Sequence, residues 1–67
     1  MSAPAAEVER IGGRVLALLR ERPRSFYELL RELEDVEYRT ILVAWGALRE
    51  RRVLGRDSHG AYLIRTP

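Results

Sequence analysis

Apolar residues in the first third of the chain recur at the spacing of an amphipathic helix. Residues 7–22 are predicted to form this helix, since one face carries an apolar set while Glu and Arg occupy the other. Gly12 and Gly13 interrupt it at a cost of about 2 kcal/mol relative to two alanines. Either another helix packs closely there, or the first turns are loosely held. Pro23 ends the element, and its apolar face consists of Val8, Ile11, Val15, Leu18 and Leu19.

A second, shorter helix is predicted from Ser25 to about Glu34. Ser25 followed by Glu28 forms a capping box, in which each side chain satisfies a backbone amide at the helix start. Asp35 is a good N-cap residue for a third helix, which is predicted to end just before Arg52. The apolar faces of the two helices consist of Phe26, Leu29, Leu30 and Leu33, and of Ile41, Ala44, Trp45 and Leu48.

After Arg52 the apolar spacing changes from helical toward the period of two that strands have. Residues 53–56 and 61–65 are predicted to pair as a β-hairpin. The connection between them is Asp57-Ser58-His59-Gly60, with Asp at its entry and Gly at its exit, which favours a tight turn.

Length and composition indicate one small domain. The chain has 67 residues and no cysteine, which excludes disulfides, thiolate metal sites and cysteine nucleophiles. We expect residues 1–6 to be a disordered tail and residues 7–67 to form the domain. The N-terminus lacks the features of a signal peptide, and no apolar run approaches the roughly 20 residues of a membrane span. We therefore expect a cytoplasmic protein without a membrane partner.

Charge is distributed unevenly, although the formal net charge is only +2. Residues 1–24 contain five Arg and three Glu, residues 25–38 contain one Arg and five carboxylates, and residues 39–67 contain six Arg and two carboxylates. Every basic residue is Arg, which suits bidentate phosphate contacts but is also typical of GC-rich genomes. The surface is therefore expected to be polarised.

The order of these elements resembles the winged helix-turn-helix superfamily. Residues 26–33 look like the second helix of that family, residues 39–56 like its third helix and first wing strand, and residues 60–64 like its second wing strand. The resemblance covers residues 7–65 and implies an α+β, mostly α fold of three helices and a two-stranded wing. Two positions depart from the family pattern. The turn after the second helix carries Glu34-Asp35 and the residue after the third helix is Arg52, where glycine is usual.

The resemblance implies a DNA-binding protein of transcription regulation, since the third helix of such proteins enters the major groove. With its apolar residues in the core, that helix presents its opposite face outward. We expect groove contacts from Tyr38, Arg39, Thr40 and Val43. The arginines at the helix end and wing, which include Arg65, favour a phosphate-binding patch or a solvated rim. We expect the phosphate contacts to come from Arg49, Arg51, Arg52 and Arg56.

A protein interface is the alternative interpretation of the third helix. The middle of its outward face is aliphatic and small, which is more typical of protein contacts than of base recognition. Glu34, Asp35 and Glu37 would repel phosphate near its start, although they also suit a helix N-terminus. On this interpretation the helix docks a larger protein or dimerises through Leu42, Val43, Gly46 and Ala47.

Catalytic, metal and cofactor sites are not expected. Asp57, Ser58 and His59 are neighbours in one turn, whereas a catalytic triad converges from separate parts of a scaffold. Asp57 and His59 would also supply too few ligands for a structural metal. We therefore expect a protein that is not an enzyme and that needs no cofactor.

Overall fold

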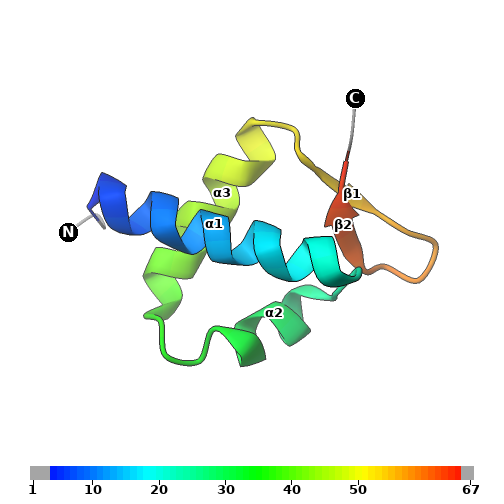
Figure 1. Cartoon of the computed structure of the whole chain (residues 1–67), viewed down its shortest axis with the longest axis horizontal. Helices are drawn as coiled ribbons and strands as arrows, with labels where there is room; N and C mark the ends of the chain where they lie inside the picture. The colour runs from blue at the N-terminus through cyan, green and yellow to red at the C-terminus, as the bar shows by residue number, and fades with distance from the viewer. Residues whose placement is uncertain (1–3, 66–67) are drawn as a thin grey trace.

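The computed structural model describes residues 4–65 and contains three helices followed by a two-stranded antiparallel hairpin (Figure 1). The elements are α1 (Ala5–Glu21), α2 (Phe26–Glu32), α3 (Tyr38–Glu50), β1 (Leu54–Arg56) and β2 (Tyr62–Ile64). In Figure 1, α1 crosses α3, and the turn of the hairpin projects away from the helices. The predicted α+β, mostly helical layout is confirmed. Within the described range, no helix combines the length and apolar character that crossing a bilayer requires.

The boundaries of α1 and α2 differ from the predictions by two residues. α1 begins at Ala5 and not at Glu7, so residues 5 and 6 belong to the helix and not to the predicted tail. Pro4 is the N-cap residue of α1, and the rest of that tail, residues 1–3, lies outside the described residues. α2 ends at Glu32, two residues before the predicted end. The capping box is confirmed, since the Glu28 amide donates to Ser25 Oγ at 3.1 Å and the Ser25 amide donates to Glu28 Oε1 at 3.0 Å.

Asp35 does not cap α3, and this prediction was wrong. The N-cap residue is Glu37, and its side chain makes no capping hydrogen bond. Asp35 instead accepts two hydrogen bonds from Arg14 of α1, at 3.0 and 3.2 Å. These bonds lower the pKa of the Asp35 carboxyl. A charge-assisted bidentate pair with another helix has replaced the local cap, and it ties the turn between α2 and α3 to α1.

The core is formed by the predicted apolar faces of the three helices. Each helix contributes residues to a single buried cluster, and the hairpin closes one end of it with partly buried side chains such as Leu54, Tyr62 and Ile64. The predicted helical periodicity is thereby confirmed. The buried hydrophobic residues are Ile11, Val15, Leu19, Leu29, Leu33, Ile41, Ala44, Trp45 and Leu48.

The two glycines of α1 lie in different surroundings. Gly12 is buried against α3, where an added Cβ would lie 3.9 Å from Leu48 Cδ2, an ordinary van der Waals distance. Gly13 is exposed, and an added Cβ would meet no atom within 4 Å. Gly12 therefore lies where α1 contacts α3, but the space there would admit a Cβ. Neither position requires glycine for steric reasons.

Arg24 joins the hairpin to the helices, a contact that the sequence did not predict. Its backbone forms an antiparallel bridge with Tyr62, with N···O distances of 3.0 and 2.7 Å. The residue is only 6% exposed, and its side chain donates to the Leu18 carbonyl at 3.1 Å and to Glu21 at 2.9 Å. This residue therefore fixes β2 against the end of α1.

Candidate nucleic-acid interface

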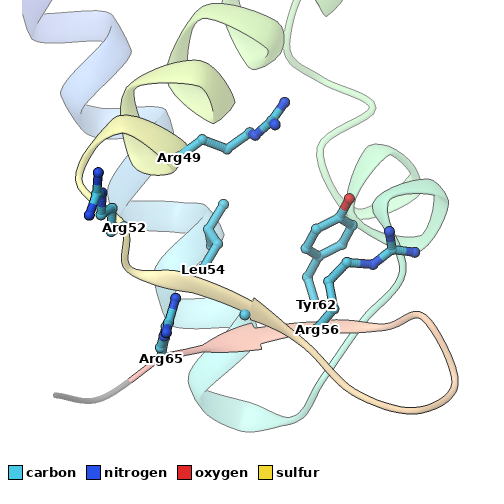
Figure 2. A pocket seen from close by; sticks show the side chains of 7 residues that line it. Arg49, Arg52, Leu54, Arg56, Tyr62 and Arg65 are labelled. Carbon is cyan, nitrogen blue, oxygen red and sulfur yellow. The ribbon is translucent and has the colours of Figure 1, made fainter.

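Four arginines surround a hollow between the end of α3 and the hairpin (Figure 2). The hollow has a volume of about 630 Å³ and opens to solvent. Figure 2 shows Arg52 and Arg65 at one end, Arg56 beside Tyr62 at the other, and Leu54 between them. No carboxylate lines it. We call this site the arginine hollow, and its residues are Arg49, Arg52, Leu54, Gly55, Arg56, Tyr62 and Arg65.

The hairpin turn sets the positions of the wing residues. The Asp57 carboxylate accepts the amides of His59 at 2.8 Å and Ala61 at 3.0 Å, and Gly60 adopts a φ of 82°. The predicted turn is thus confirmed, and the Asp57 side chain is bound to the backbone of its own turn. The resulting register places Arg56 opposite Tyr62.

Tyr62 connects the arginine hollow to the core. Its ring centroid lies 4.8 Å from that of Trp45, with the rings at 89°. Trp45 in turn packs on Phe26 at 5.0 Å, so α2, α3 and β2 share one aromatic cluster. The guanidinium carbon of Arg56 lies 5.0 Å from the Tyr62 centroid, a cation–π distance. The position of Arg56 therefore depends on a residue that also packs in the core.

Arg52 adopts a left-handed backbone conformation. It follows the α3 C-cap residue Arg51, has a φ of 59°, and donates its amide to the Arg49 carbonyl at 3.0 Å. Glycine is the usual residue at this position, because the Cβ of any other residue crowds the backbone at a cost of about 1 kcal/mol or more. The chain thus places an arginine of the hollow where glycine would be more stable.

The arginines of the hollow have no acidic partner among residues 4–65. Within that range the ion pairs are made by Arg10, Arg14, Arg22 and Arg24, which all precede α2. The predicted polarisation of charge is therefore present in the fold. Around α1 most arginines pair with carboxylates, with Arg20 as the exception in the described part of the chain, whereas the arginines of the wing make no such pair.

The outward face of α3 begins with Tyr38 and continues through exposed apolar residues. Tyr38, Leu42 and Val43 are 55%, 43% and 40% exposed, and Arg39 and Gly46 are exposed beside them. Thr40 is only 8% exposed, so its predicted position on this face was wrong. It shares a ridge with Ala44 and Leu48, four and eight residues later, and all three pack inward.

The arginine hollow contains three of the four predicted phosphate contacts. Arg51 is exposed but lies elsewhere, in a groove between α1 and α3 that it lines with Glu9 and the two glycines of α1. Arg65 takes part in the hollow, as expected for the patch of C-terminal arginines. Tyr62, Leu54 and Gly55 were not predicted. The turn at residues 57–60 fixes the pairing of the two strands, and this pairing could have placed these residues beside Arg56.

The site combines several guanidinium groups with an apolar helix face. Guanidinium groups bind phosphate through paired N–H donors, and an exposed helix of this length fits a major groove. Comparison of the chain with known protein families, curated proteins and solved structures finds no match.

Proposed function

We propose that the chain is a winged-helix protein that binds double-stranded DNA, in a cytoplasmic role in transcription regulation and not as an enzyme. In this proposal α3 enters the major groove and the arginine hollow binds the phosphate backbone. The observation that carries it is the group of Arg49, Arg52, Arg56 and Arg65 around one hollow, without a carboxylate within ion-pair distance among the described residues. Uncompensated arginines beside an exposed helix complement a phosphate backbone.

The left-handed conformation of Arg52 supports the same proposal. Backbone strain at a non-glycine residue often occurs at functional sites, where the rest of the structure holds the residue in place. Here the side chain that glycine would lack is one of the four that surround the hollow. A role for Arg52 in phosphate binding gives this costly arrangement a physical reason.

Protein interaction is the second candidate function, and the exposure of α3 favours it. Leu42, Val43 and Tyr38 lie close together on one helix face and are each at least 40% exposed. Adjacent exposed apolar residues are more typical of interfaces than single ones. In this second proposal a partner protein or another copy of the chain covers the face, and the arginine hollow is a solvated rim.

Fluorescence anisotropy with a labelled random-sequence duplex tests the first proposal. The 67-residue chain is titrated at about 50 mM and 200 mM salt. Four phosphate contacts predict a slope of log K against log salt of about −3.6, and hence a loss of roughly 100-fold over this range. Absence of binding at the lower salt concentration contradicts DNA binding, because the electrostatic attraction is then strongest.

A charge-matched pair of variants separates the hollow from general basicity. Arg49→Ala with Arg56→Ala removes two charges from the hollow, and should reduce the salt slope by about 2. Arg20→Ala with Arg31→Ala removes the same charge from exposed positions of α1 and α2 outside it. Equal losses in the two double variants would assign the binding to net charge and not to the hollow. If the chain binds no DNA but self-associates, and Val43→Glu weakens that self-association, the second candidate function is supported instead.

A further inference from the structure

The outward face of α3 has few groups that can read bases by hydrogen bonding. At its centre lie Leu42, Val43 and Gly46, and between them and the helix start Arg39 is the one exposed charged side chain. The 67-residue sequence contains no Asn and no Gln. These are the residues that recognise adenine through a bidentate contact in the major groove. Without them, the group of an A·T pair that the centre of this face can contact is its other distinctive group.

That other group is apolar. Thymine carries a C5 methyl in the major groove, and cytosine presents only hydrogen there. Leu42 and Val43 flank Gly46, which lies one helical turn further along α3 and at which an added Cβ would meet no atom within 4 Å. Gly46 thus leaves open space between Leu42 and Val43, with a backbone that a methyl group can approach closely.

Arginine side chains lie toward both ends of this apolar face, with the acidic Glu50 next to the second of them. Arg39 and Arg49 lie on the exposed side of α3, ten residues apart, or about 15 Å along the helix axis. The major groove is about 12 Å wide and is bounded by phosphates. An arginine side chain at each end can therefore reach a groove wall while the apolar residues between them face the base edges. This complementarity favours DNA over an apolar protein partner as the occupant.

We propose that α3 reads thymine methyl groups through Leu42, Val43 and the open backbone at Gly46, and so selects T-containing sites. The inference rests on the proposed DNA binding and adds a specificity to it. It predicts that affinity follows the C5 methyl group, whichever base carries it.

Replacement of thymine by uracil tests this directly. Anisotropy compares an alternating dA·dT duplex with the same duplex containing dU, which lacks only the methyl group. Each buried methyl contributes about fourfold in affinity, so two contacts predict a loss of about 16-fold. Duplexes with 5-methylcytosine should correspondingly bind more tightly than those with cytosine. In the Leu42→Ala, Val43→Ala double variant, the affinity ratios of dT to dU and of 5-methylcytosine to cytosine should both fall toward one. Arg49→Ala should weaken binding to all duplexes equally.

The outcomes for the specificity and for DNA binding are distinct. Equal affinity for dT and dU duplexes, together with the salt dependence described above, overturns methyl recognition and leaves DNA binding in place. Absence of binding to every duplex overturns both. A chain that binds no duplex and sediments as a dimer, which Val43→Glu dissociates, assigns the face to a second copy of the chain. Circular dichroism of the double alanine variant verifies that loss of the ratio does not reflect unfolding.

Discussion

The rings of Trp45 and Tyr62 meet at 89° with their centroids 4.8 Å apart, and this contact couples α3 to the hairpin. The Tyr62 ring also contacts the Arg56 guanidinium, whose central carbon lies 5.0 Å from the ring centroid. The Tyr62 side chain therefore contacts both the core and an arginine of the hollow, so the position of Arg56 depends on how Tyr62 packs. Loss of this ring should affect both stability and the geometry of the hollow.

Substitution of Tyr62 by leucine removes the aromatic ring but keeps an apolar side chain at this position. Tyr62→Leu removes the aromatic contact and the cation–π contact, and we expect a loss of about 1–2 kcal/mol in the free energy of unfolding. Tyr62→Phe keeps both ring contacts, and no hydrogen bond of the Tyr62 hydroxyl is found within residues 4–65, so a change below about 0.5 kcal/mol is expected. Urea titration measures both. Equal stability of the leucine and phenylalanine variants would show that the ring contacts contribute nothing specific.

Gly13→Ala should stabilise the protein. Gly13 is in the middle of α1, is exposed, and leaves open space for a methyl group. Alanine in a helix interior is more favourable than glycine by about 1 kcal/mol, which for a domain of this size raises Tm by about 4–8 °C. Gly60→Ala is the opposite control, since Gly60 has a φ of 82° and alanine there should lower Tm. A lower Tm for Gly13→Ala would contradict the placement of this residue in a regular exposed helix.

Local signals in the sequence predicted the fold well. The capping box at Ser25, the Asp57–Gly60 turn and the helical spacing of core residues each depend on neighbours within a few positions. Asp35 was misplaced because its partner, Arg14, lies 21 residues earlier. The bridge of Arg24 to Tyr62 has the same character, since one backbone residue between two helices carries no strand pattern. Contacts of long sequence separation were the ones that local patterns could not supply.

The candidate site was predicted in part for a related reason. Arginine type and position indicated a patch at the end of α3, but the direction of each side chain depends on the helix phase and on the hairpin register. Arg49 and Arg51 are two residues apart and so point to different sides of the helix, which separates Arg51 from the hollow. Thr40 was placed outward because only apolar residues were assigned to the core. Its spacing from Ala44 was the signal that could have corrected this.

The Ser25–Glu28 capping box should contribute to acid sensitivity. The backbone amide of Ser25 is the main cause that lowers the pKa of Glu28, with a further contribution from Arg22. Because this pKa is lower in the folded state, the stabilisation is present above the unfolded pKa of about 4.3 and is lost as pH falls through the folded pKa. Glu28→Gln can keep the capping geometry without titrating. We therefore expect its Tm to fall less than that of the native chain between about pH 6 and about pH 3.

Other carboxyl groups limit how much the pH dependence of Tm can differ between Glu28→Gln and the native chain. The pKa values of Glu7 and Asp35 are also lowered, by hydrogen bonds from Arg10 and Arg14 respectively. Both residues remain in the Glu28→Gln variant, so its acid transition should become shallower and not disappear. An unchanged dependence of Tm on pH in this variant would exclude the capping box as a source of acid sensitivity.

Glu50→Gln should strengthen DNA binding. Glu50 is the last residue of α3 and is exposed one turn after Gly46, on the helix side that we assign to DNA. Removal of its charge relieves repulsion of phosphate, and an increase in affinity of up to about fivefold is expected. It also removes a negative charge from a helix C-terminus, which favours stability. Glu9→Gln changes the same charge on α1 and should have a smaller effect on affinity. Weaker binding of Glu50→Gln would place DNA on another face.

Arg52→Gly should make the protein more stable and less able to bind DNA. Glycine adopts the left-handed conformation at this position without the steric cost that arginine bears, so we expect a gain of about 1 kcal/mol in the free energy of unfolding. Loss of one phosphate contact should lower the affinity and reduce the salt slope by about 1. Thermal unfolding and anisotropy of the same sample measure the two effects. Arg52→Asn is the matched control, since asparagine tolerates this conformation better than arginine and removes the charge as glycine does. A gain in stability with unchanged affinity in both variants would show that the backbone cost at Arg52 has no role in binding.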